Sequence, residues 1–226
     1  MMNNAENPQL TIPRVIGSLS FFNADNLEIM RGFKDKEFDL AIVDPPYGIG
    51  YSGRDGQKTI KYDNKKKWDN ETPKQEYFDE LFRISKNQII WGANYFTKFF
   101  ELGKGIICWF KHQNGNFSQW EMAYTSIGNA KHFDRSYQQD QYNKIHPTQK
   151  PIELYRWLLH TYANKGDKIF DSHLGSGSIA VACDDLGFDL TACEIDSDYF
   201  RKASKRLDVY RRQQTLFNCV QRFRYE

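Results

Sequence analysis

Residues 168–194 constrain the fold of this chain most, because they predict a strand, a glycine turn, a helix and a second strand within one short unit. An apolar segment that ends at Asp171 predicts a buried strand, and Gly175 and Gly177 follow it closely. The next residues predict a helix that stops at Gly187, a common breaker at helix C-termini. The unit therefore indicates a parallel α/β sheet with a nucleotide-binding turn.

Different nucleotide cofactors would suit this turn. Gly175, Gly177 and Ala180 fit the G-x-G-x-x-A pattern of dinucleotide-binding turns, and Glu194 lies about 20 residues further on, where an acid can bind ribose hydroxyls. Asp171, at the strand end, favours S-adenosylmethionine, because a carboxylate there can reach the amino group of the methionine part. We expect S-adenosylmethionine, with a nicotinamide cofactor as the distant alternative.

A stiff turn follows another apolar segment, earlier in the chain. Phe38–Val43 predicts a buried strand, and Asp44-Pro45-Pro46-Tyr47 comes directly after it. The prolines fix their own φ angles and restrict the residue before each. Such a turn can hold a planar amine, since the Asp44 carboxylate and the Pro45 carbonyl can accept its N–H bonds while Tyr47 stacks on the ring. An ordinary strand-ending turn is the alternative.

Together, the motifs resemble those of the DNA amino-methyltransferases, in the β-class arrangement. In that family a D-P-P-Y turn precedes a D-x-x-x-G-S-G cofactor turn, as residues 44–47 precede residues 171–177 here. The resemblance covers about residues 22–207, and the segments 91–96 and 146–151 are similar to further family segments. It implies a single Rossmann-like, S-adenosylmethionine-dependent methyltransferase domain. Its sheet would be circularly permuted, seven-stranded and mostly parallel.

The resemblance also implies roles for particular residues. Asp44, Pro45, Pro46 and Tyr47 would bind and activate a flipped-out adenine, so that its N6 amine attacks the sulfonium methyl group. No metal is expected, because the positive sulfur already activates that methyl group. The residues expected to bind the cofactor are Asp25, Thr148, Lys150, Asp171, His173, Gly175, Ser176, Gly177 and Glu194.

Within the cofactor turn, the chain departs from the family pattern. Ser172-His173 replaces the usual Pro-Phe, whose aromatic ring helps to wall the cofactor pocket. We expect His173 to be a partly buried histidine bonded to a backbone carbonyl, rather than a catalytic group. Asp44 as the first residue of its motif indicates adenine N6, because cytosine N4 goes more often with S-P-P-Y. Cytosine N4 or an RNA amine remains the alternative substrate, and a non-catalytic nucleic-acid-binding module is the alternative class of protein.

Charge alone does not identify a partner, because the formal net charge is only +2. Residues 52–72 are locally basic, and we expect them to form a mobile loop that contacts DNA phosphates, with a solvated surface loop as the alternative. Residues 129–145 are polar and form the candidate target-recognition insert, with a plain surface loop as the alternative. Duplex DNA is the expected partner, and homodimers are in keeping with the family. A companion endonuclease or second subunit stays open.

The length of 226 residues suits one α/β domain, expected over residues 16–212. We expect residues 1–15 to be disordered, a helix to run from Ser197 to about residue 212, and residues 213–226 to form a tail. The cysteines show no metal-binding or disulfide spacing, which suits a cytoplasmic protein, and no apolar segment approaches the length of a membrane helix.

Overall fold

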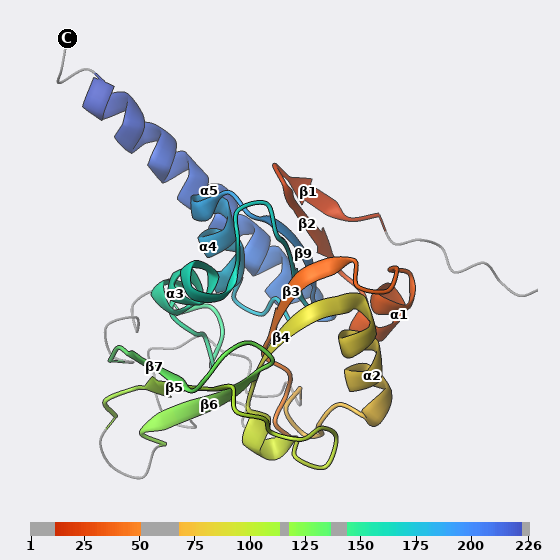
Figure 1. Cartoon of the computed structure of the whole chain (residues 1–226). Helices are drawn as coiled ribbons and strands as arrows, with labels where there is room; N and C mark the ends of the chain where they lie inside the picture. Colours follow the sequence, from red (N-terminus) through yellow and green to blue (C-terminus); the bar gives the residue numbers. More distant parts are fainter. Residues whose placement is uncertain (1–11, 51–67, 114–117, 137–143, 223–226) are drawn as a thin grey trace, which may run out of the picture.

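The computed structural model describes residues 12–50, 68–113, 118–136 and 144–222. These residues form one nine-stranded sheet with helices on both faces (Figure 1). The strands are β1 (Arg14–Ile16), β2 (Leu19–Phe22), β3 (Phe38–Val43), β4 (Ser85–Trp91), β5 (Ile106–Phe110), β6 (Trp120–Thr125), β7 (Lys131–Asp134), β8 (Lys168–Asp171) and β9 (Asp189–Cys193). The helices are α1 (Asn26–Arg31), α2 (Gln75–Ile84), the 3₁₀ helix η1 (Ala93–Tyr95), α3 (Ile152–Tyr162), α4 (Ser178–Leu186) and α5 (Ser197–Arg222).

The strand order across the sheet is β1-β2-β9-β8-β3-β4-β6-β5-β7. The central strands, from β2 to β4, all pair in parallel. Antiparallel pairing joins β1 to β2, and β6 to its neighbours β4 and β5. The sheet is therefore mixed and mostly parallel, as predicted. The late strands β8 and β9 lie between the early strands β2 and β3, which is the order expected of a circularly permuted sheet.

Both edges of the sheet differ from the sequence-based expectation, which gave seven strands in all. At one edge, residues 14–16 form β1, so that the end of the segment expected to be disordered, residues 14 and 15, is part of a strand. Gly17, with φ of 64°, turns the chain back to pair with β2. At the other edge, residues 131–134 of the expected target-recognition insert form β7, which pairs in parallel with β5. Residues 1–11 and 137–143 lie outside the described residues.

The apolar sequence of β3 is explained by burial on both of its faces. Leu40 and Ile42 belong to the core on the side of α3, α4 and α5. Ala41 and Val43 belong to the core on the side of α1 and α2. Figure 1 shows these two helical layers on opposite sides of the central strands. A strand enclosed in this way needs apolar residues at successive positions rather than at alternate ones.

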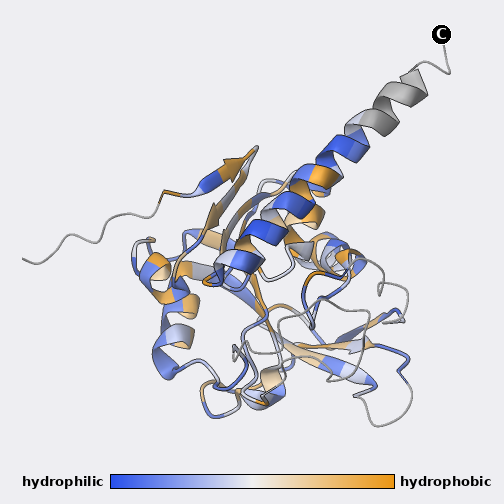
Figure 2. Ribbon diagram, turned by 180° about the vertical axis from the view of Figure 1, so that it is seen from behind, coloured by the Kyte–Doolittle hydropathy of each residue, from blue (hydrophilic) through white to orange (hydrophobic). Residues whose placement is uncertain are grey.

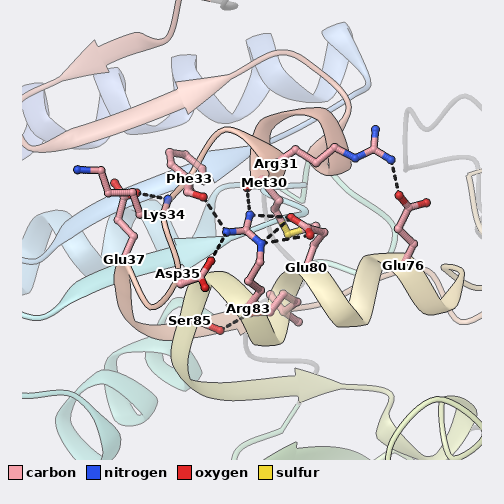
Figure 3. A network of polar contacts seen from close by, with 11 residues as sticks. Met30, Arg31, Phe33, Lys34, Asp35, Glu37, Glu76, Glu80, Arg83 and Ser85 are labelled. Carbon is pink, nitrogen blue, oxygen red and sulfur yellow. Dashed lines mark hydrogen bonds and ion pairs between the residues drawn. The ribbon is translucent and has the colours of Figure 1, made fainter.

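Arg83 connects α2 to α1 and to the loop that follows α1 (Figure 3). Its guanidinium donates to the carbonyl oxygens of Met30 and Phe33, at 2.9 and 2.8 Å. It also bonds the carboxylates of Asp35, at 2.8 Å, and Glu80, at 2.7 Å. Arg83 thus satisfies carbonyl groups where α1 ends and fixes the chain that leads into β3.

Helix α5 is longer than the sequence pattern indicated. It runs to Arg222 instead of ending near residue 212, so that residues 213–222 are helical and do not form a tail. No glycine or proline occurs between Ser197 and Arg222 to end it earlier. The helix projects beyond the sheet, and its described side chains are largely hydrophilic (Figures 1 and 2). Among the described helices, none combines the length and apolarity needed to cross a membrane.

Candidate active site

The Asp44-Pro45-Pro46-Tyr47 turn lies at the carboxyl end of β3. Folds of this kind bind their ligands at the carboxyl ends of the parallel strands. The Tyr47 hydroxyl donates to Asp44 Oδ1 at 2.7 Å. On the other side of the turn, the backbone N–H groups of Tyr47 and Gly48 both donate to Asp69 Oδ1, at 2.6 and 3.0 Å. Asp69 is only 4% exposed, so it holds the turn from below as a buried acceptor.

Close aromatic packing sets the orientation of the Tyr47 ring. It stacks on Tyr95 with 5.0 Å between ring centroids and 14° between ring planes, and meets Phe96 edge-on. Gly92 has φ of 71°, and a Cβ atom built there would lie 2.2 Å from Cε1 of Tyr47. Glycine is therefore required at position 92 both by the backbone conformation and by the approach of the tyrosine.

A cluster of charges, with buried lysines and half-buried carboxylates, lies against the turn. Lys150 Nζ is 2.6 Å from Asp44 Oδ2 and 3.2 Å from Glu121 Oε2, and it donates to the Tyr47 hydroxyl at 3.3 Å. Glu121 Oε1 in turn accepts a bond from Lys111 Nζ at 2.7 Å. The Lys150 side chain is 3% exposed, so these charges interact with little screening by solvent.

The pKa values in this cluster are set by burial and by the alternation of positive and negative side chains. Burial would raise the pKa of Glu121, but the ammonium groups of Lys150 and Lys111 outweigh it and hold that pKa at about 2. Burial would likewise lower the pKa of Lys150, and the carboxylates of Asp44 and Glu121 raise it instead. The pKa of Asp44 is raised by burial, with Lys150 opposing that shift and Glu121 adding to it.

The glycine turn after β8 brings the chain close to α5. Gly175 and Gly177 have φ of 51° and 71°, a left-handed conformation that favours glycine. A Cβ atom on Gly177 would lie 3.1 Å from Cβ of Ala203 on α5. The glycines therefore allow both the tight turn and the close packing of α5, and their role toward a cofactor stays a prediction.

Acidic side chains flank this turn. Asp171 is 3% exposed, and its Oδ1 accepts the backbone N–H of His173 at 3.0 Å. Burial raises the pKa of Asp171 to about 8; the His173 N–H opposes the shift, and the charges of Asp44 and Glu194 add to it. Glu194 accepts the N–H of Gly175 at 2.8 Å through Oε2, and its Oε1 accepts that of residue 196.

His173 is held by side chains, and not by a backbone carbonyl as expected. Asn26 Nδ2 lies 3.0 Å from its Nε2 and also donates to the Ser172 carbonyl, so Nε2 must accept. The proton is then on Nδ1, which donates to Ser172 Oγ at 2.7 Å. Ser172 Oγ is 2.6 Å from the Tyr77 hydroxyl. Burial lowers the pKa of His173 to about 3, so the ring is neutral and has a structural part in the turn.

The other predicted cofactor residues make local contacts. Asp25 caps α1 by accepting backbone N–H bonds through Oδ1. Thr148 Oγ1 is 3.1 Å from His146 Nδ1, and Ser176 Oγ is 3.1 Å from Ser178 Oγ. Their roles toward a cofactor remain predictions. Within the described residues, no group of three or more histidine, cysteine or acidic side chains is placed to hold a metal ion.

Asp69 and Glu121 are site residues that sequence reasoning missed. A single acid on a strand, such as Glu121 on β6, belongs to no motif. The available signal was weak: Lys111, ten positions earlier and of opposite charge, follows β5, which pairs with the strand of Glu121 only in the folded sheet. Asp69 lies within the basic segment 52–72, of which residues up to 67 are outside the described part of the chain. No local pattern links it to a turn that lies 22 positions away.

The sheet is Rossmann-like. A glycine turn with buried carboxylates follows β8, and the Asp44 turn, with its hydrogen-bond acceptors, follows the neighbouring strand β3. This arrangement is typical of α/β proteins that bind a nucleotide cofactor beside a second ligand. A family model described as DNA methylase matches residues 60–205. The chain belongs to this N6/N4 DNA methylase family and is a DNA methyltransferase of that family.

Individual relatives agree with this assignment. DNA adenine methyltransferase YhdJ of Escherichia coli (strain K12) is 37% identical over 86 residues, which cover 36% of this chain and 28% of YhdJ. The crystal structure of the M1.HpyAVI-SAM complex superposes with a TM-score of 0.58 at 21% identity, covering 84% of this chain and 100% of that one. The cytosine-N4-specific PvuII DNA methyltransferase gives a TM-score of 0.58 at 12% identity, covering 82% and 85%. These structures confirm the predicted fold.

Proposed function

We propose that this DNA methyltransferase transfers a methyl group from S-adenosylmethionine to the N6 amine of an adenine flipped out of duplex DNA. The observation that carries the proposal is the position of the Asp44 turn: it lies at the carboxyl end of β3, and the buried carboxylate of Asp171 lies at the carboxyl end of the neighbouring strand β8. The electrostatic influence of Asp44 on the pKa of Asp171 is consistent with this proximity.

The residues around the glycine turn fit S-adenosylmethionine. Asp171 is a buried carboxylate with a pKa of about 8, which a cationic amino group would return to its ionised form. Glu194 is an acid beside the turn where ribose hydroxyls would lie, and a Cβ atom built on Gly175 would meet only the His173 carbonyl oxygen, at 3.7 Å. When bound, the cofactor supplies a methyl group that its positive sulfur has already activated. The M1.HpyAVI structure was solved as a complex with SAM, which supports this choice.

The chain's own groups would activate the amine. An exocyclic adenine amine is a poor nucleophile, because its lone pair is delocalised into the ring. Asp44 and the carbonyl of the buried Pro45 can accept its N–H bonds and restore lone-pair character. Asp44 keeps one lone pair on each oxygen beyond its bonds to Lys150 and Tyr47. The ring of Tyr47, already held by its aromatic neighbours, would replace the stacking that the flipped base loses.

Adenine is favoured over cytosine by the first residue of the turn, Asp44, and by the likeness to YhdJ, which is named an adenine methyltransferase. Cytosine N4 is the second candidate, because the PvuII enzyme of that specificity has an equally similar fold. Its exocyclic amine would use the same acceptors. The basic segment 52–72 and the segment 129–145 remain candidates for contacts with DNA.

The test is methyl transfer itself. Purified protein would be incubated with methyl-labelled S-adenosylmethionine and mixed-sequence duplex DNA, and the labelled nucleoside identified after digestion. We expect N6-methyladenine from the native chain and none from Asp44→Ala, with cofactor affinity retained. Asp189→Asn, an exposed acid at the start of β9, is the matched control and should keep full turnover. Label on cytosine would transfer the assignment to N4, and turnover by Asp44→Ala would refute the role of the turn.

A further inference from the structure

The Lys150 ammonium group lies among three oxygen atoms. Its Nζ donates to the Tyr47 hydroxyl at 3.3 Å and forms ion pairs with Asp44 Oδ2 at 2.6 Å and with Glu121 Oε2 at 3.2 Å. The ring of Trp91, fully buried, lies with its centroid 5.2 Å from the same nitrogen. The side chain therefore has defined contacts, and it holds one oxygen of Asp44 in place.

Glu121 shares the charge of Lys150 with Asp44. The glutamate comes from β6, a neighbour of β4 in the sheet, and Lys111 binds its other oxygen at 2.7 Å. Without Glu121, the full ammonium charge would act on Asp44 and weaken it as an acceptor for an amine that becomes positive. With Glu121, the ammonium is divided between two carboxylates, and Asp44 keeps more of its negative charge.

We propose that Glu121 and Lys150 are positioning residues, which set the orientation and the acceptor strength of Asp44 from the side away from the amine. This inference rests on the proposed function. It assigns Lys150, which the resemblance implied would bind the cofactor, to Asp44 instead, and it adds Glu121, which belongs to no motif. Lys150 directs the carboxylate, and Glu121 limits how strongly Lys150 withdraws charge from it.

The inference predicts pH effects of opposite sign for the two residues. Glu121 raises the pKa of Asp44 and Lys150 lowers it, while burial raises it further. Removing the Glu121 charge should therefore move the acid limb of the kcat profile to lower pH, and removing the Lys150 charge should move it to higher pH. The titratable groups around Asp44 are Tyr47 on its own turn, Tyr77 on α2, Glu121 on β6, Lys150 before α3, Tyr155 on α3 and Asp171 after β8.

The variants are Glu121→Gln and Lys150→Met, which keep the shape of each side chain and remove its charge. We expect each to lower kcat by roughly tenfold or more, a part of the factor of about 100 or more that a positioned acid or base contributes. The acid limbs should shift in opposite directions by about one pH unit. For Glu121→Gln, the affinity for S-adenosylmethionine, measured by calorimetry, should stay within about twofold, because Glu121 is not among the groups that shift the pKa of Asp171.

Controls separate position from general electrostatics and from folding. Asp208→Asn and Lys86→Met remove charges from partly exposed ion pairs that are not among the groups acting on Asp44, and should change neither kcat nor the pH profile. If Lys150→Met alone does not fold, because it leaves buried carboxylates unbalanced, the double variant with Glu121→Gln removes one of those charges. In the double variant, the acid limb should lie between those of the single variants.

A second measurement does not depend on turnover. Carboxyl carbon NMR titration of Asp44, assigned from the signal lost in Asp44→Asn, reports its pKa in each variant. Opposite shifts uphold the inference. Two results would overturn the inference: equal or absent shifts with kcat within about twofold, or a loss of cofactor affinity in Lys150→Met without a pH shift. If the native chain still methylates DNA, the proposed function stands in either case. If the native chain methylates no amine, the proposed function fails, and the NMR shifts alone decide whether the residues act on Asp44.

Discussion

Burial removes charge from both titratable side chains of the glycine turn. The pKa of the Asp171 carboxyl rises to about 8, and the pKa of the His173 imidazole falls to about 3, so each favours its neutral form at pH 7. The consequences differ because His173 is fully engaged with Ser172 and Asn26. Asp171 is instead a neutral acid that a cation can ionise.

Proton release should therefore accompany cofactor binding. At pH 7, below the pKa of about 8, Asp171 is mostly protonated, and a bound ammonium would lower that pKa and expel the proton. We expect close to one proton to be released, and affinity to rise as the pH rises toward 8. Calorimetry in buffers of different ionisation enthalpy measures the release directly. Asp171→Asn should bind without it, and release of a full proton by that variant would assign the effect to another group.

Gly92 makes a second residue-scale prediction. Gly92→Ala would add a Cβ atom 2.2 Å from the Tyr47 ring and place alanine at φ of 71°. We expect Tyr47 to be displaced, turnover to be lost, and the free energy of unfolding to fall by about 1–3 kcal/mol. Urea denaturation and methylation rates measure the two effects. Gly103→Ala is the matched control, since a Cβ atom there meets nothing within 4 Å, and equal losses in both variants would contradict the explanation.

Some residues of the site belong to a recognisable local sequence motif, and others do not. Asp44, Tyr47 and Asp171 each follow an apolar strand within a short motif, so the sequence alone identifies them. Asp69 and Glu121 reach the site only because the chain folds back over 22 positions in one case, and because β6 pairs beside β4 in the other. Contacts of this kind depend on the whole sheet and leave no signal at their own position.

At the scale of elements, the presence or absence of helix-breaking residues decided which boundaries the sequence could predict. The unit β8–α4–β9 lies within a residue of expectation, because Gly177 and Gly187 mark both ends of its helix. The end of α5 was misplaced because its sequence holds no breaker. Edge strands β1 and β7 were missed because each has a single neighbour and little burial to shape its sequence.

Arg83 supports the α1–α2 layer, and its loss should be costly. Arg83→Met removes bonds to the carbonyls of Met30 and Phe33 and to two carboxylates. We expect the free energy of unfolding to fall by about 2 kcal/mol, since hydrogen bonds from charged groups typically contribute about 1.5–3 kcal/mol. Urea denaturation checks this. Arg201→Met breaks an exposed pair on α5 and should cost no more than about 0.5 kcal/mol, so similar losses would contradict the prediction.

At the scale of the whole molecule, the two halves of the chain share one sheet. Strands β9 and β8 are inserted between β2 and β3, so the central core draws on both ends of the sequence. Leu40 and Ile42 on β3 are covered by helices that follow residue 150. The domain should accordingly unfold as one cooperative unit.

A fragment of residues 1–140 should not fold by itself. It would lack β8, β9 and the helices that cover one face of β3, and would expose that face and the strand edge to water. We expect a poorly dispersed NMR spectrum and no cooperative thermal transition, with recovery on co-expression with residues 141–226. A dispersed spectrum from the isolated fragment would show that the halves are independent.

The same interleaving has a consequence for biosynthesis. A ribosome releases β2 and β3 early, but one partner strand of each, β9 and β8, leaves the exit tunnel only after most of the chain has been made. Throughout that interval, the nascent polypeptide carries open strand edges around the future catalytic turn. The rate of translation through the middle of the message, and the protection given by chaperones, should thus govern the yield of active protein more than its final stability does.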